Sequence, residues 1–202
     1  MLQGAPDPCP PSDSGVRGFS LLESVLVLGL LALTAAIALP SILGGLDDAR
    51  AVAAARHVAG LVRLTRVQAA ARSTRAGLRF KREGATYVDA NGTGLRRRDI
   101  RSGIDEPITP VERLGDRFPG VVLGVAAGVT RISDGRAMAG DADPVRLGSA
   151  DTLIFSPLGT ATSGTIFLRS RKGRQYAVRV LGATGRTRVL EFRHETKSWT
   201  AR

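Results

Sequence analysis

An apolar run near the N-terminus constrains this chain more than any other feature of its sequence. Residues 24–39 contain no charged side chain, and residues 19–22 extend the run upstream. Because about 20 apolar residues suffice for a helix to cross a bilayer, the sequence predicts a transmembrane helix over about 19–43. Glu23 lies just inside this run, where a carboxylate in hydrocarbon costs roughly 2.5–3.5 kcal/mol. We therefore expect Glu23 either to have a partner or to be recognised by another protein.

The segment before the apolar run separates two interpretations of it. Residues 1–18 are polar and rich in Pro, and Arg17 lies next to the boundary. A secretory signal would be cleaved after its apolar region, at small residues, but Gly44-Gly45 is a poor site of that kind. The Gly18–Phe19 junction lies before the apolar region instead. The sequence therefore favours a retained helix over an ordinary signal peptide.

Composition limits the kinds of partner and of site. The formal net charge is +11, which indicates an anionic partner such as nucleic acid or lipid headgroups, or else only the Arg-rich composition of a GC-rich genome. The single cysteine, Cys9, excludes an intrachain disulfide. Together with His57 and His194 it shows no zinc-type spacing. No P-loop, GxSxG or HExxH motif is present, so we expect no enzyme, no cofactor and no metal site.

The residues around the Gly18–Phe19 junction resemble the class III signal of type IV pilins and type II secretion pseudopilins. They read GFSLLE over 18–23 and lead into an apolar helix that contains Pro40. The resemblance implies cleavage between Gly18 and Phe19 by a prepilin peptidase, N-methylation of Phe19, and retention of the helix in the bacterial inner membrane. It also implies an assembly role for Glu23, which would pair with the N-terminal amine of a neighbouring subunit. The alternative is an acid that reaches the headgroups near a helix end.

The periodicity continues beyond the apolar run and predicts one long helix over 19–75, with a kink at Pro40. Asp47 and Asp48 suit the N-terminus of its second half. Apolar and small polar side chains recur on one broad face of that half, which indicates packing on a globular domain: Val52, Val58, Leu61, Val62 and Thr65.

From residue 76 onward, short strands with turn residues predict a fold of the α+β class, with the long helix packed on an antiparallel β-sheet or sandwich domain. We expect a leader at 1–18, the helix at 19–75 and a single periplasmic β-rich domain at 76–202. The expected strands are 77–82 and 86–89 (a hairpin around Glu83-Gly84), 95–101, 120–125, 152–156, 164–170, 175–181 and 186–193, with a loop over 133–150. The stretches 153–161 and 185–189 resemble the pseudopilin H and FimT group.

Basic residues gather at the C-terminal end, where residues 164–202 contain ten Lys or Arg and two Glu. In FimT-like minor pilins, a Gly-Arg-x-Arg segment near the C-terminus is associated with DNA binding, so the resemblance assigns DNA contact to Arg186 and Arg188 with their neighbours Arg179 and Arg193. Arg186 and Arg188 would share one face of a strand. The alternative is that Gly185 shapes a β-turn and that the arginines protect a solvated sheet edge.

Two functions remain at this stage. The leading hypothesis is a non-enzymatic minor pseudopilin of a type II secretion pseudopilus, which would assemble with other pseudopilins and aid export of folded proteins across the outer membrane. Its partners would be a prepilin peptidase, the inner membrane and the other filament subunits. The rival is a FimT-like minor pilin that binds DNA for uptake.

Overall fold

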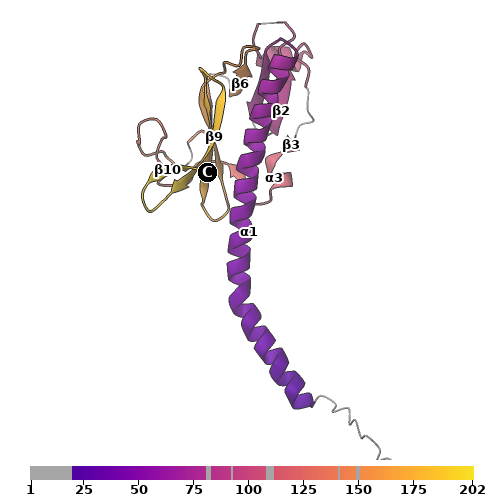
Figure 1. Cartoon of the computed structure of the whole chain (residues 1–202), viewed down its shortest axis with the longest axis vertical. Coiled ribbons are helices and arrows are strands. Elements are labelled where there is room, and N and C mark those ends of the chain that lie inside the picture. The colour runs from indigo at the N-terminus through magenta and orange to yellow at the C-terminus, as the bar shows by residue number, and fades with distance from the viewer. Residues whose placement is uncertain (1–19, 81–82, 92, 108–111, 141, 149–150) are drawn as a thin grey trace, which may run out of the picture. The chain divides into compact units, whose positions relative to one another are not determined.

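A computed structural model describes residues 20–80, 83–91, 93–107, 112–140, 142–148 and 151–202. The chain divides into two compact units, residues 1–42 and residues 43–202. The fold is α+β, as predicted: a long helix, α1 (Leu21–Ala71), precedes antiparallel β-sheets (Figure 1).

Helix α1 ends without the glycine that commonly follows the last turn of an α-helix. Ser73 has a left-handed backbone with φ of 50°. The amides of Ser73 and Thr74 then donate to the carbonyl oxygens of Ala70 and Ala69, at 3.2 Å each. These two bonds form the usual C-terminal closure of an α-helix, in which the last carbonyls find donors just beyond the final turn. The chain then enters the first strand at Ala76.

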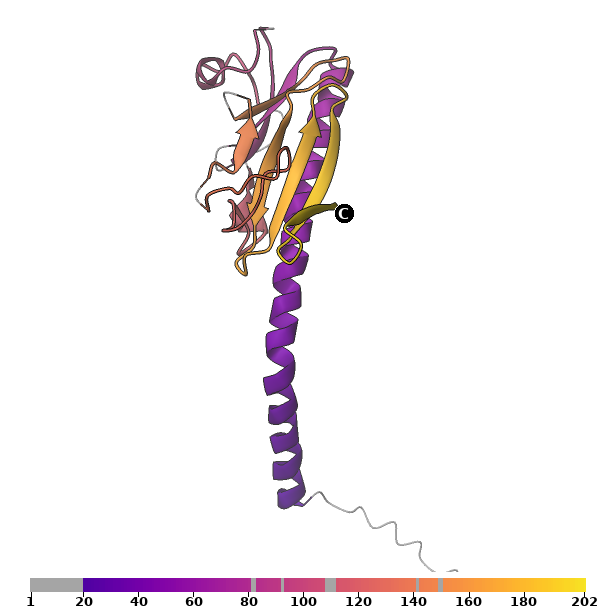
Figure 2. The same ribbon diagram turned by 90° about the vertical axis from the view of Figure 1, so that its left-hand side faces the viewer.

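The strands of residues 43–202 form two antiparallel sheets (Figures 1 and 2). The four-stranded sheet has the order β3-β2-β1-β6 and consists of β1 (Ala76–Phe80), β2 (Glu83–Val88), β3 (Glu112–Arg113) and β6 (Thr152–Phe155). The six-stranded sheet has the order β10-β9-β8-β7-β4, with β5 also paired to β7. It consists of β4 (Val122–Leu123), β5 (Val145–Leu147), β7 (Gly164–Arg169), β8 (Gln175–Leu181), β9 (Arg186–Arg193) and β10 (Ser198–Ala201). Two short helices, α2 (Arg97–Arg101) and α3 (Leu114–Arg117), lie in the connections.

The second half of α1 supplies one side of the main core. Val52, Val58, Val62 and Thr65 are buried and Leu61 is partly buried, so the helix face that the periodicity predicted is confirmed. These residues share one cluster with apolar side chains from both sheets. The largest fully buried members from the sheets are Leu78, Leu147, Leu153, Phe155, Ile166, Leu168 and Tyr176.

The opposite face of the six-stranded sheet carries a second, smaller core. Phe167, Leu190 and Phe192 project from this face and pack against the ring of Trp199 from β10. They are also covered by Val125, Ala126, Val129, Ile132, Met138 and Ala142. The Trp199 ring lies 5.1 Å from that of Phe192 and 5.8 Å from that of Phe167, in the tilted geometry that aromatic pairs prefer. The sheet is therefore buried on both faces over much of its area.

Several expected strands differ from the structure. Within residues 95–101, expected to form a strand, residues 97–101 form α2, because local side-chain contacts replace cross-strand pairing there. The Thr93 hydroxyl oxygen lies 2.7 Å from Asn91 Oδ1 and 3.3 Å from Asp99 Oδ2, within hydrogen-bond distance of both. The first hairpin is confirmed: Phe80 pairs with Gly84, and β2 begins at Glu83.

The expected loop over 133–150 contains the short strand β5, and the C-terminus adds β10, which the sequence pattern did not indicate. Both are three or four residues long. Alternation over so few residues is too short to distinguish from chance. The predicted strand over 120–125 is confirmed only at Val122–Leu123.

Candidate functional site

The first half of α1 presents apolar side chains on every side. Residues 20–39 are all exposed, including Leu21 at 82% and Ile37 at 74%. By length and composition this is a helix able to cross a membrane, with a mean hydropathy of 2.4 in its most apolar window. Thr34 Oγ1 donates to the Leu31 carbonyl of the same helix at 2.9 Å, which satisfies this hydroxyl without an outside partner. An apolar helix exposed all round needs lipid or other helices to cover it.

The residues expected to govern processing and assembly lie at the start of this helix. Gly18 and Phe19 lie outside the described residues, so cleavage and N-methylation stay predictions. Glu23 lies in the first turn of α1 and is exposed, and it has no ion pair within the part of the chain that the structure describes. A carboxylate in the first turn is favoured by the helix dipole. Helix α1 continues through Pro40; the predicted kink stays a prediction.

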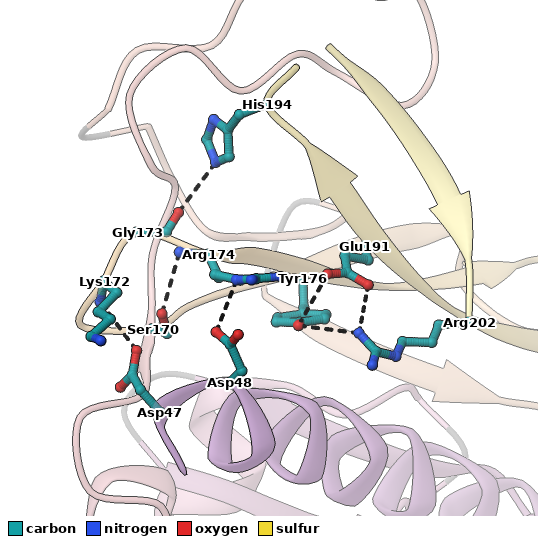
Figure 3. A network of polar contacts seen from close by, with 10 residues as sticks. All are labelled: Asp47, Asp48, Ser170, Lys172, Gly173, Arg174, Tyr176, Glu191, His194 and Arg202. Atoms are coloured by element: carbon teal, nitrogen blue, oxygen red, sulfur yellow. Dashed lines mark hydrogen bonds and ion pairs between the residues drawn. The ribbon is translucent and has the colours of Figure 1, made fainter. Parts of the chain in front are cut away.

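Within residues 43–202, a polar network joins the helix to the six-stranded sheet (Figure 3). Asp48 Oδ1 lies 2.9 Å from Arg174 Nε, and Arg174 also contacts Glu191 Oε1 at 3.3 Å. The other Glu191 oxygen lies 2.6 Å from the Arg202 guanidinium. Tyr176 completes the network by donating its hydroxyl hydrogen to Glu191 Oε1 at 3.3 Å. Arg174 thus connects Asp48 of the helix to Glu191 of β9. The Glu191 carboxylate also contacts Tyr176 of β8 and Arg202.

A second attachment lies beside this network, at the turn between β7 and β8. Asp47 Oδ2 accepts a hydrogen bond from the backbone amide of Lys172 at 3.3 Å. The amide of Arg174 donates to Ser170 Oγ at 3.2 Å, which holds the turn closed (Figure 3). Asp47 and Asp48 therefore lie inside α1 and bind this turn, so their expected place at a helix N-terminus is wrong. Paired acids of this kind do not interrupt a helix when the sheet supplies their partners.

Burial controls the ionisation of Tyr176, whose side chain is fully buried. Desolvation raises the pKa of Tyr176 above its ordinary value of 10.0, and the negative charge of Glu191 raises this pKa further. The hydroxyl therefore stays protonated and acts as a donor. The network is suited to holding the helix on the sheet.

The predicted DNA-contacting arginines fall into two groups. Arg179 on β8 is directly opposite Arg188 on β9. Both line a cleft of about 490 Å³ on the outer face of the six-stranded sheet, together with Arg131 and Lys197. Arg186 is exposed at the start of β9, opposite Leu181. It projects from the same face of the strand as Arg188, as the spacing predicted.

Arg193 lies apart from the other three. It is at the far end of β9, five residues from Arg188, or about 17 Å along a strand. There it lines a different hollow with Arg174, Glu191 and Glu195. The structure therefore brings Arg179, Arg186 and Arg188 together and separates Arg193 from them.

Acidic side chains gather around residues 89–105, a feature that the sequence reasoning did not identify. Asp89, Asp99 and Asp105 are buried. Desolvation raises the pKa of Asp105, and the negative charges of Asp89 and Asp99 raise it further. A hydrogen bond from Asn91 lowers the pKa of Asp99. Among the described residues, no group of three or more His, Cys, Asp or Glu is arranged to hold a metal ion.

The sequence reasoning also missed the contributions of Asp48, Arg174, Glu191 and Arg202 to the network, and those of Arg131 and Lys197 to the cleft. A local signal existed only for the two strands that carry Tyr176 and Glu191, β8 and β9. Their meeting depends on the β8–β9 register, in which Tyr176 pairs with Glu191. Register of this kind cannot be read from single strands.

An exposed apolar helix at the N-terminus, followed by antiparallel sheets, fits a pilin-like protein. Comparison with known proteins supports this class and makes it more specific. The chain is 42% identical over 59 residues to type II secretion system protein H of Xanthomonas campestris pv. campestris. The resemblance to the pseudopilin H group is thus confirmed over that stretch.

The matched stretch covers 29% of this chain and 35% of the relative, so the chain spans about a third of the length of the curated relative that it matches. No protein-family profile matches the chain, and no solved structure matches it.

Proposed function

We propose that this protein is a minor pseudopilin of a type II secretion pseudopilus, a structural subunit that aids export of folded proteins across the outer membrane. The observation that carries the proposal is the apolar half of α1, which is exposed on all sides and begins with an acid in its first turn. Such a helix is stable in a bilayer and, after extraction, in a bundle of like helices. The similarity to a type II secretion system protein supports the same assignment. The role is that of an assembling subunit and involves no catalysis.

The proposal places the apolar helix in the bacterial inner membrane as a single span, with the β domain in the periplasm. A prepilin peptidase removes residues 1–18, and the amine of Phe19 is methylated. Intact-mass analysis of protein purified from membranes tests this, with and without a co-expressed prepilin peptidase. We expect the mass of residues 19–202 plus one methyl group when the peptidase is present. A full-length mass under both conditions would show that the processing step is wrong.

Glu23 acts in assembly by pairing with the N-terminal amine of a neighbouring subunit. Such a buried pair contributes register more than net stability. Glu23→Ala should therefore be cleaved normally and yet enter filaments poorly. Ser24→Ala is the matched control, because among the described residues the Ser24 hydroxyl bonds only to the carbonyl of Ser20, one turn earlier in the chain. Immunoblotting of sheared filaments measures incorporation, and equal incorporation of the two variants would remove this role.

The alternative function, a FimT-like minor pilin that binds DNA for uptake, is favoured by one observation. Arg186 and Arg188 are both exposed on one face of β9, beside Arg179. If each of two arginines contacts one phosphate, replacing both with Ala lowers the slope of log K against log salt by about 1.8. Arg101→Ala, an exposed arginine on α2, serves as control. Duplex DNA binding with a slope unchanged by the double substitution would exclude this alternative.

A further inference from the structure

The cleft that contains Arg179 and Arg188 is part of a longer groove. A second hollow of about 220 Å³ shares Arg131, Ile132, Arg179 and Leu181 with the cleft of about 490 Å³. The two hollows therefore adjoin along the outer face of the six-stranded sheet, between β8–β9 and the segment around residues 130–135. We refer to both hollows together as the basic groove.

The rim of the basic groove is strongly cationic. Arg131, Arg146, Arg179, Arg188 and Lys197 line it, and no Asp or Glu is among its described lining residues. Arg131 has a neighbour in Asp134, 3.8 Å away, whereas Arg179 and Arg188 have no acidic partner within the described part of the chain. These two arginines also face each other across neighbouring strands, an arrangement of like charges that opposes folding. An anionic ligand between them would relieve that repulsion.

The floor of the groove is apolar, which restricts the kind of anion. Ile132, Leu181, Leu190 and Trp199 line the larger hollow, and Leu181 is 38% exposed. The indole N–H of Trp199 already donates to the Thr130 carbonyl at 2.8 Å, so the ring offers an apolar surface and no spare donor. A duplex phosphate backbone has no group that fills such a hollow. A peptide has one, because a bulky side chain enters the floor while flanking carboxylates reach the rim.

We propose that the basic groove binds an extended acidic segment of a partner protein, in which a bulky apolar side chain is flanked by Asp or Glu. The apolar side chain occupies the hollow beside Trp199, and the carboxylates pair with the guanidinium groups of Arg179 and Arg188. A second copy of this chain is a poor occupant, because the net charge of +11 and the basic C-terminal region repel a like surface. This inference goes beyond the proposed function and does not depend on the filament to which the protein belongs.

Trp199 is the only tryptophan of the chain and lines the groove, so its fluorescence reports occupancy. The full chain in nonionic detergent micelles is titrated with the peptide acetyl-Asp-Glu-Phe-Glu-Asp-amide. Two peptides test the two parts of the proposed recognition, one with Asn and Gln in place of the acids and one with Ala in place of Phe. We expect a saturable change with the first peptide, with a dissociation constant below about 1 mM, and at least about tenfold weaker binding of each control.

Variants locate the site. Arg179→Gln with Arg188→Gln should weaken the acidic peptide about tenfold or more. Arg186→Gln removes a charge of the same strand that does not line the groove, and it should leave binding within about twofold. Far-ultraviolet circular dichroism confirms that the variants are folded. Equal weakening by Arg186→Gln would show only a diffuse charge effect and would overturn the proposal.

A competition experiment separates the two classes of anionic macromolecule. A short duplex DNA should leave the Trp199 signal of the peptide complex unchanged at physiological salt. If DNA instead displaces the peptide, and does so only when Arg179 and Arg188 are present, the groove is a nucleic-acid site and the peptide proposal is wrong. Absence of any saturable change with the acidic peptide would also overturn it.

Discussion

Glu191 is the carboxylate on which the helix–sheet network depends, and its replacement gives a quantitative test of that network. Its side chain is 20% exposed and contacts the guanidinium groups of Arg174 and Arg202 at 3.3 and 2.6 Å. It also accepts the hydroxyl hydrogen of the buried Tyr176. Glu191→Gln keeps the shape and one acceptor oxygen, but it places an amide donor against the Arg202 guanidinium. We expect the variant to fold with lower stability.

The magnitude follows from the exposure of each partner. The Arg174 and Arg202 side chains are 52% and 44% exposed, so solvent weakens both ion pairs and each contributes about 0.5 kcal/mol. The bond from Tyr176 changes from charge-assisted to neutral, a further loss of about 0.5 kcal/mol. The total of about 1.5 kcal/mol corresponds to a fall in Tm of about 3–6 °C for a chain of this size.

Thermal unfolding of the full chain in nonionic micelles, followed by Trp199 fluorescence, measures the change. Glu195→Gln is the matched control, because Glu195 is exposed in the β9–β10 turn and has no ion pair with any described residue. Tyr176→Phe combined with Glu191→Gln should destabilise by less than the sum of the two single changes, because both remove the same hydrogen bond. Equal Tm values for Glu191→Gln and Glu195→Gln would refute the reasoning.

Three further predictions concern stability and use the same unfolding measurement. Gly185→Ala should lower the free energy of unfolding by about 2 kcal/mol or more, because Gly185 has φ of 59° and an added Cβ would meet the Gly159 carbonyl. Gly128→Ala is its control, because an added Cβ there meets no atom within 4 Å and the substitution costs only backbone strain. Gln175→Met should cost roughly 2–4 kcal/mol, because the buried Gln175 amide donates to three carbonyls and accepts the Ala126 amide at 2.7 Å; Gln68→Met, on a half-buried helix position, should change little. Asp105→Asn should stabilise the chain at neutral pH and lose that advantage below about pH 3.8. The reason is that the pKa of Asp105 is raised on folding, so the stability of the wild-type chain falls as the pH rises from 3.8 through the pKa of the folded state. The first prediction is wrong if Gly128→Ala costs more than Gly185→Ala, and the second is wrong if Gln68→Met costs as much as Gln175→Met. The third is wrong if the effect of Asp105→Asn does not change with pH.

The helix and the longer strands could be predicted because their signals are local. Val58, Val62 and Thr65 recur at helical spacing, and the same spacing places all three in the core. β8 and β9 each extend over seven or eight residues, long enough for alternation and bounding Gly residues to define them. The positive φ of Gly185 also follows from its position between two such strands.

The features of the fold and of the candidate site that could not be predicted depend on contacts between residues that are distant in the sequence. Asp47 and Asp48 resemble helix-capping residues when considered alone, and only the β7–β8 turn explains their place inside α1. Gln175 resembles an ordinary strand residue, and its burial requires the segment 124–126 to lie across it. The net charge of the C-terminal region indicated an anionic partner, but not that Arg131 and Lys197 would join Arg179 and Arg188 around one cleft.

Side chains alternate along β9, which places the basic groove and the Glu191 network on opposite faces of the same strand. Arg186, Arg188, Leu190 and Phe192 share the face that carries the basic groove and the second core, while Val189 and Glu191 face the helix and its network. A slip of one residue in the β8–β9 register would exchange these two faces. It would bury the arginines against α1 and expose Leu190 and Phe192. Burial of these apolar side chains specifies the register that presents Arg188 to a ligand, and the Glu191 network favours the same register.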